Sequence, residues 1–138
     1  INLPLIQDPA NHLKMKTAAD LSLHSSALSG KIKTAVTHYH TLFSSQDWSL
    51  ITLKLDTGRT HQIRVHMASI NHPLLGDEVY GPKQKPFATQ GQVLHAGVLG
   101  FDHPITGEYM EWHADLPDYF QEILKRLRYT DFFGAYRI

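Results

Sequence analysis

The sequence predicts an α+β fold with a largely antiparallel mixed sheet and few flanking helices. Residues 34–43 and 48–55 both alternate in polarity and are separated by a short polar loop, which is typical of a β-hairpin. Residues 93–101 and 108–114 flank a turn that contains proline and glycine, and they predict a second hairpin. Strands that pair as hairpins, with few helices between them, favour α+β over an alternating α/β arrangement.

The first hairpin carries chemically useful side chains on both faces. Because alternate residues of a strand point to opposite faces, His38 and His40 share one face of its first strand and Tyr39 lies on the other. We expect loops before this hairpin, in residues 1 to about 30, where prolines and small polar residues are frequent.

Helices are predicted from the spacing of apolar residues. Ile63, Met67 and Ile70 recur at helical intervals and predict a helix over residues 59–70 whose apolar stripe faces the core. A second helix is predicted over residues 117–127, because a proline suits its first position and apolar residues recur along one side.

Composition excludes several classes of protein. Thirteen lysine and arginine residues balance thirteen aspartate and glutamate residues, so any contact with RNA must be a local patch. Cysteine is absent, which excludes disulfides and thiol catalysis and leads us to expect a cytoplasmic location. No apolar stretch approaches the roughly 20 residues that cross a membrane. The sequence starts without a methionine or a signal-peptide pattern, so we expect Ile1 to be an internal cut in a longer protein.

Two arginines mark the first helix as a candidate anion site. The N-terminus of a helix favours anions, so Arg59 and Thr60 at the expected start predict a place for a phosphate or a carboxylate. Arg64 lies about one turn later and off the apolar stripe. An arginine held on a helix can clamp a carboxylate through two parallel hydrogen bonds.

Ten histidines raise the alternative of a His-rich metal-binding or structural domain. His61 and His66 are five residues apart, whereas a helical zinc pair is four apart. His38 and His40 share a strand face but have no evident third ligand. The spacing therefore predicts no metal site.

Several motifs together resemble one family. They are Thr57-Gly58-Arg59-Thr60-His61-Gln62-Ile63-Arg64-Val65-His66, Gly76-Asp77-Glu78-Val79-Tyr80-Gly81, Lys33-Thr34-Ala35-Val36-Thr37-His38-Tyr39 and Leu94-His95-Ala96. This set resembles the RluA-type RNA pseudouridine synthases, which isomerise uridine in ribosomal or transfer RNA. The resemblance implies that residues 1–138 are the C-terminal portion of a single pseudouridine-synthase-like catalytic domain, with RNA as partner and no cofactor.

The resemblance also implies roles for single residues. Arg64 would pair with the nucleophilic aspartate and align it, and Tyr39 would stack on a uracil flipped out of the RNA. RNA contacts fall to Arg59, which would meet a phosphate, and to Thr60, Lys31 and Lys33. The motif's remaining polar residues would hold structure by hydrogen bonds; they are His61, Gln62, His66, Asp77 and Tyr80.

The family's nucleophile belongs to a His-Arg-Leu-Asp-x-x-Thr-Ser-Gly-like motif, and residues 1–138 contain no such motif. We therefore expect the isolated chain to be inactive, although the parent protein would be a synthase. An RNA-binding module without catalysis is a second hypothesis, and the His-rich metal-binding or structural domain is a third. The sequence does not choose between ribosomal and transfer RNA.

Overall fold

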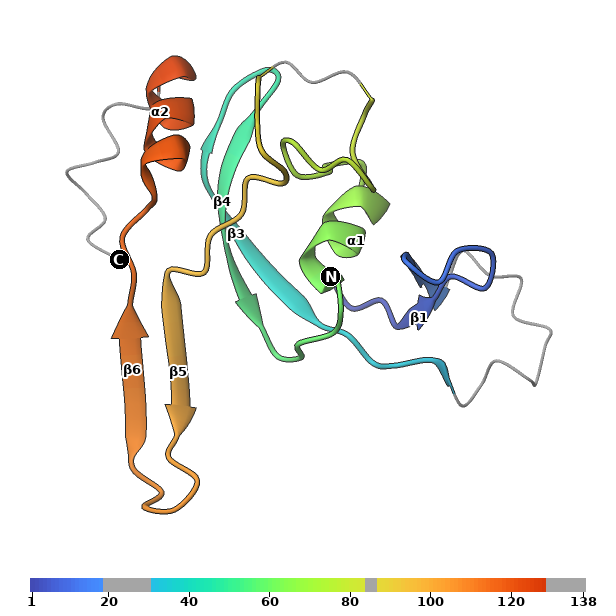
Figure 1. Cartoon of the computed structure of the whole chain (residues 1–138), viewed down its shortest axis with the longest axis vertical. Helices are drawn as coiled ribbons and strands as arrows, with labels where there is room; N and C mark the ends of the chain where they lie inside the picture. Colours follow the sequence, from blue (N-terminus) through green and yellow to red (C-terminus); the bar gives the residue numbers. More distant parts are fainter. Residues whose placement is uncertain (19–30, 84–86, 129–138) are drawn as a thin grey trace. The chain divides into compact units, whose positions relative to one another are not determined.

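Every strand that the structure describes pairs antiparallel with one neighbour, which confirms the predicted α+β class. The structure is a computed structural model that describes residues 1–18, 31–83 and 87–128. Its described strands form three separate two-stranded sheets rather than the one sheet expected from the sequence. Contacts divide the chain into two compact units, Ile1–Gln92 and Val93–Ile138, so the single domain expected from the sequence stays a prediction (Figure 1).

The first sheet lies in the segment that was expected to be loop. Strands β1 (Leu5–Gln7) and β2 (Met15–Thr17) form an antiparallel pair, and the turn between them is closed by a bond from the Asp8 amide to the Lys14 carbonyl, at 2.9 Å. Each strand has only three residues, which is too short for alternation to be recognised. The small polar stretch at 19–30 lies outside the described residues.

The second sheet is the predicted hairpin of β3 (Thr37–Ser44) and β4 (Ser49–Leu55). Its register places Tyr39 opposite Leu53, and a bulge interrupts the pairing after Thr41. Strand β3 begins three residues later than predicted, because the preceding segment makes isolated bridges to the N-terminal residues instead.

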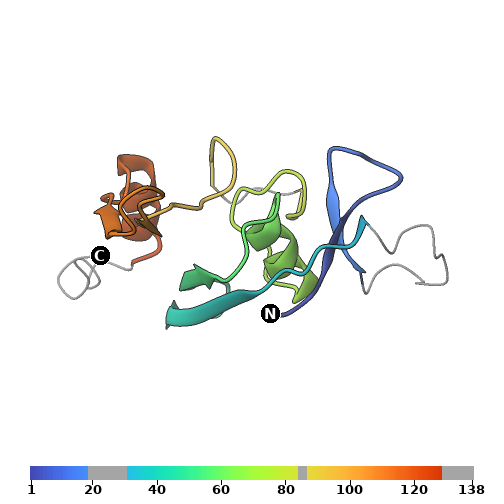
Figure 2. The same cartoon turned by 90° about the horizontal axis from the view of Figure 1, so that it is seen from below.

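Helix α1 (Gln62–Ser69) begins later than the predicted residue 59. The residue before it, His61, adopts a left-handed backbone with φ of 56°, which ends the turn and delays the helix. Of the three residues in the predicted apolar stripe, Met67 is buried, whereas Ile63 and Ile70 are only half-buried. The helix lies beside β3 in both views (Figures 1 and 2).

The buried face of α1 is largely polar. Its buried residues are Gln62, Val65, His66 and Met67. Val65 joins the small apolar cluster of this unit, in which Leu5 and Ala35 are fully buried and Met15 and Tyr80 pack at the edge. Two large polar side chains at a helix–strand contact must find partners there, since an unpaired buried polar group is costly. Their partners define the site described below.

The second unit holds the other predicted hairpin, β5 (Val98–Asp102) and β6 (Tyr109–His113), followed by α2 (Asp118–Arg126). Both hairpin and helix are confirmed, with Pro117 as the residue that precedes the helix. Ile123 and Leu124 bury the apolar side of α2. None of the helices in the described residues is long and apolar enough to span a membrane.

Candidate RNA-modifying site

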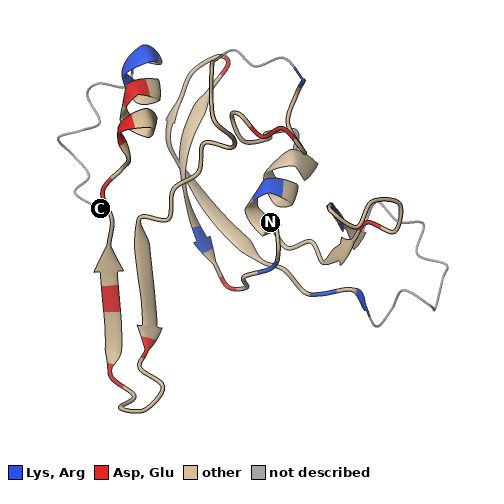
Figure 3. Ribbon diagram, viewed as in Figure 1, with Lys and Arg blue, Asp and Glu red and all other residues tan. Residues whose placement is uncertain are grey.

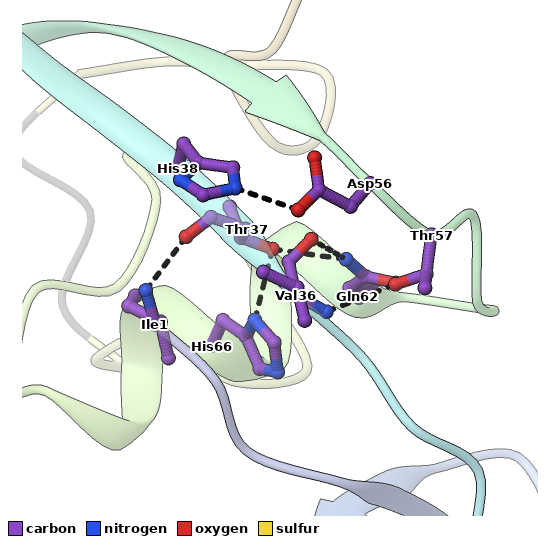
Figure 4. A network of polar contacts seen from close by, with 8 residues as sticks. All are labelled: Ile1, Val36, Thr37, His38, Asp56, Thr57, Gln62 and His66. Carbon is purple, nitrogen blue, oxygen red and sulfur yellow. Dashed lines mark hydrogen bonds and ion pairs between the residues drawn. The ribbon is translucent and has the colours of Figure 1, made fainter.

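The Gln62 side chain makes four of the hydrogen bonds that fix the turn between β4 and α1. Its Oε1 accepts a hydrogen bond from Thr57 Oγ1 at 2.8 Å (Figure 4). It also accepts one from the Arg59 amide at 3.0 Å. Its Nε2 donates to the Val36 carbonyl at 2.9 Å and to Thr37 Oγ1 at 3.0 Å. All four bonds of the carboxamide are thus made, and they tie the turn to the start of β3.

The network continues from Thr37 to the N-terminal segment through His66, whose side chain is fully buried. Nε2 of His66 lies 2.8 Å from the Leu3 carbonyl, which can only accept, so Nε2 carries the proton. Nδ1 then accepts from Thr37 Oγ1 at 2.9 Å. Burial lowers the pKa of His66 below its ordinary value, which agrees with this neutral tautomer.

Arg64 and Asp77 form a two-point ion pair next to this network. Nε and Nη2 of Arg64 each lie 2.8 Å from one oxygen of the Asp77 carboxylate. The Asp77 side chain is 0% exposed and that of Arg64 is 12% exposed. Oδ1 of Asp77 also accepts the amides of Val79 and Tyr80. Burial raises the pKa of Asp77, but the bonds from Arg64 and from these amides outweigh it and hold the pKa below its ordinary value.

Tyr80 connects this ion pair to the first sheet. The Arg64 guanidinium lies over its ring at 5.1 Å, and its hydroxyl accepts the Met15 amide at 2.8 Å. The same hydroxyl lies 2.9 Å from Nδ1 of His61, whose pKa is lowered by burial and by the nearby Arg64 charge. The motif residues His61, Gln62 and His66 therefore hold structure through hydrogen bonds, as the sequence predicted.

Two glycines allow the loop around Asp77 to close. Gly76 has φ of 75°, and a Cβ there would collide with the Gly91 carbonyl and with Thr89 Oγ1. A Cβ at Gly81 would collide with the carbonyl of Asp77. The loop that places the Asp77 carboxylate beside Arg64 thus depends on glycine at positions 76 and 81, where a side chain would not fit.

Arg59 and Thr60 lie in the turn before α1, so the prediction that they open the helix is wrong. The Arg59 amide is already bonded to Gln62, so it offers no free helix-terminal N–H to an anion. The side chains of both residues are exposed, and Nε of Arg59 donates to the Thr34 carbonyl at 3.1 Å. Arg59 therefore faces solvent on a turn whose backbone is fixed.

Tyr39 and the predicted basic residues are accessible. The Tyr39 ring is 48% exposed, and its hydroxyl makes no hydrogen bond within the part of the chain that the structure describes. Lys31 and Lys33 are exposed in the segment that leads into β3, and Lys54 is exposed near the end of β4. Figure 3 shows positive residues at the end of β4, in the turn after it and along that leading segment.

The structure brings Arg64 to Asp77, a pairing that the sequence analysis did not propose. Both residues were singled out, but they are thirteen positions apart on different elements, and nothing in the pattern linked them. Their opposite charges could have indicated the pairing, because an arginine and an aspartate that are both buried must neutralise each other.

Among residues 1–18, 31–83 and 87–128, no three metal-ligating side chains lie close enough to hold an ion. His38 is instead bonded to Asp56, at 2.7 Å.

Comparison with known proteins places this geometry in a family. The family model for RNA pseudouridylate synthase matches residues 7–69, which include β2 through α1. The chain belongs to the RNA pseudouridylate synthase family. The matched range contains Tyr39, Arg59, Gln62 and Arg64.

Three curated relatives show how much of the family's sequence is present. An uncharacterized RNA pseudouridine synthase of Bacillus subtilis is 57% identical over 96 residues, which is 70% of this chain and 31% of the relative. The ribosomal large subunit pseudouridine synthases D of Haemophilus influenzae and Zymomonas mobilis are 48% and 42% identical, and the matches cover 70% and 92% of this chain. These two matches cover 33% and 39% of the relatives, so the chain spans about a third of their length.

A solved structure of the same family supports the fold. Human RNA pseudouridylate synthase domain containing 4 superposes with a TM-score of 0.65 over 93% of this chain and 55% of the human chain. The sequences are 22% identical, so the likeness concerns the fold alone. It confirms the pseudouridine-synthase-like fold expected from the sequence.

Proposed function

We propose that this chain, within its whole protein, binds large-subunit ribosomal RNA and contributes Tyr39 and Arg59 to the isomerisation of uridine to pseudouridine. Relatives in Haemophilus influenzae and Zymomonas mobilis carry the name ribosomal large subunit pseudouridine synthase, which favours ribosomal over transfer RNA. One observation carries the proposal. Tyr39 is an exposed aromatic residue on β3, and the hydrogen bonds of Gln62 connect the start of that strand to the turn that bears the exposed Arg59.

Tyr39 suits the role of a holder for an extruded base. Its ring is half exposed on β3, and its hydroxyl is left without a partner among the described residues. A base that has been flipped out of RNA loses its stacking, and an aromatic face restores part of it. The pairing of Tyr39 with Leu53 on β4 keeps the ring at a fixed place on the hairpin.

The two arginines of the motif suit different tasks. Asp77 fills the Nε–Nη2 edge of Arg64, so a second carboxylate can reach only the terminal Nη1–Nη2 end of a side chain that is 12% exposed. Arg59 has one N–H engaged and is exposed. This supports Arg64 as a clamp that positions the site through Asp77, and Arg59 as the arginine that meets an RNA phosphate.

The proposed reaction needs an aspartate from another segment of the whole protein. That carboxylate acts at the ribose, the bond from C1′ to N1 breaks, the uracil turns, and a bond from C1′ to C5 forms. The proton on C5 then leaves to solvent and N1, freed from C1′, takes up a proton, so the base is aromatic again and the product has the composition of the substrate. The reaction is an isomerisation, so no oxidant, reductant or cofactor enters its balance.

Loss of the C5 hydrogen gives a direct assay. The complete protein should release tritium from large-subunit ribosomal RNA labelled with 5-tritiated uridine, and it should release less from labelled transfer RNA. Tyr39→Ala should reduce the rate by at least about ten-fold, because the base loses its stacking partner. Release from neither RNA by the wild-type protein would overturn the proposal, and release only from transfer RNA would overturn the choice of substrate.

A second candidate function is an RNA-binding module without catalysis, which would use the same exposed residues and need no nucleophile. The same assay separates the two functions when it is run beside a binding measurement. Tight binding of ribosomal RNA without tritium release from the complete protein is the result that would select the binding module.

A further inference from the structure

One exposed hydrogen-bonded pair lies on the hairpin face opposite the proposed uridine site. Nε2 of His38 is 2.7 Å from Oδ2 of Asp56, and the two side chains are 59% and 52% exposed (Figure 4). His38 precedes Tyr39 on β3, so its side chain points to the opposite face of the hairpin. Asp56 is the first residue after β4 and begins the turn that carries Arg59.

The position of this pair matters more than its contribution to stability. A polar pair whose side chains are more than half exposed contributes little to folding, because water competes with it and screens any charge. Yet this pair joins the start of β3 to the turn, on the hairpin face that Gln62 does not reach. Two further bonds join the same segments: the Asp56 amide donates to the Val36 carbonyl at 3.3 Å, and the Val36 amide donates to Thr57 Oγ1 at 2.9 Å.

We propose that His38 and Asp56 are a positioning pair for the uridine site, one that sets the separation between the Tyr39 ring and the Arg59 guanidinium. The inference rests on the proposed function, because it assumes that Tyr39 holds the base and that Arg59 meets a phosphate. Gln62 holds the turn from the α1 side, and the His38–Asp56 bond holds it from the other side. Without the His38–Asp56 bond, the turn can tilt about Gln62, and the distance between Arg59 and Tyr39 then changes.

Charged neighbours define what can compete with the pair. Lys54 is exposed and lies opposite His38 in the strand register. Its ammonium is therefore the hairpin cation placed nearest to Asp56 in register. His40 lies on the same face, two residues along β3, opposite Thr52. His40 makes no hydrogen bond or ion pair within the described residues. It is therefore a matched control, because it is the same residue type on the same face of the same strand but has no bonded partner.

Four substitutions separate the bond from the side chains. His38→Ala and Asp56→Ala remove the bond. His38→Gln retains a nitrogen donor near the place of Nε2, and Asp56→Asn retains an oxygen acceptor, so both conservative variants can keep it. His40→Ala is the control. All are made in the complete protein and assayed for single-turnover tritium release on large-subunit ribosomal RNA, for RNA affinity and for thermal unfolding.

A positioning role predicts a specific split between these measurements. The two alanine variants should lose about ten-fold or more in single-turnover rate, because small displacements of a binding group are costly to the chemical step. Their RNA dissociation constants should stay within about two-fold of wild type, and their melting temperatures within a few degrees. The Gln and Asn variants should recover most of the rate, and the double alanine variant should be no slower than either single one.

Several results would overturn the inference while leaving the proposed function intact. One is an equal rate for His38→Ala and His40→Ala, and another is a His38→Gln variant as slow as His38→Ala. A loss confined to RNA affinity would make the pair an RNA contact, and a large fall in melting temperature would make it a structural one. If the wild-type protein releases no tritium, it is the proposed function that fails.

Discussion

Arg64 and Asp77 meet edge to edge, with both nitrogen–oxygen distances at 2.8 Å and the carboxylate wholly buried. The pair joins α1 to the loop that follows it, and Tyr80 extends the connection to β2. An arginine that sequence alone suggests for the reaction centre is thus engaged in holding the frame. The buried Arg64–Asp77 pair, together with the proposed RNA contact of Arg59, leads to the following predictions.

Breaking the buried pair should be far more costly than breaking the exposed one. Asp77→Asn leaves the Arg64 charge buried without its partner and should lower the free energy of unfolding by roughly 3–5 kcal/mol. Asp56→Ala, which removes the exposed bond to His38, should change it by less than about 1 kcal/mol. Urea unfolding of the two variants and the wild type measures the difference. Equal effects would show that Asp77 is not the anchor described here.

Stability should fall as the pH is lowered below neutrality. Burial holds the pKa of His66 below the ordinary value of 6.5, and burial with the Arg64 charge does the same for His61. The unfolded chain therefore takes up protons near pH 6.5 that the folded chain does not. Stability contributed by the neutral imidazoles is complete above about pH 6.5 and is lost as the pH falls from there towards the folded-state pKa values.

Urea unfolding between pH 8 and pH 5 measures this dependence. His66→Gln should flatten the decline, whereas His40→Gln, at an exposed position, should leave it unchanged. A wild-type stability that is constant across this range, in a protein that stays folded, would contradict the neutral assignment of His66.

The loop glycine at position 76 should not tolerate a side chain. Gly76→Ala must accept both a left-handed φ and collisions with the Gly91 carbonyl and Thr89 Oγ1, so it should destabilise the fold by at least about 1–3 kcal/mol. Gly58→Ala is the control, since a Cβ there meets nothing within 4 Å, and it should change stability by less than about 0.5 kcal/mol. Comparable melting temperatures for the two variants would show that the loop around Asp77 rearranges freely.

Sequence patterns predicted the long elements and missed contacts between distant residues. The β3–β4 and β5–β6 hairpins and α2 follow local alternation and spacing, so they were predictable. The buried face of α1 was not, because Gln62 and His66 are polar and their burial depends on partners in β3 and at Leu3. A spacing rule that counts apolar residues places Ile63 in the core and overlooks both.

The motif could be recognised from the sequence, but the use of its residues could not. The run from Thr57 to His66 pointed to the family, and the family model confirms it. Which arginine is engaged depends on Asp77, which a left-handed glycine turn brings back to α1. That return is set by backbone geometry in a loop with no periodic signal.

The most direct test of the account is the salt dependence of ribosomal RNA binding by Arg59→Ala and Arg64→Lys, measured beside the wild type in the complete protein. Each phosphate contact contributes about 0.7–0.9 to the slope of log affinity against log salt concentration. The account predicts that Arg59→Ala weakens binding and lowers the slope by about that amount, while Arg64→Lys leaves the slope unchanged and lowers the melting temperature. An unchanged slope for Arg59→Ala, with a reduced one for Arg64→Lys, would contradict it.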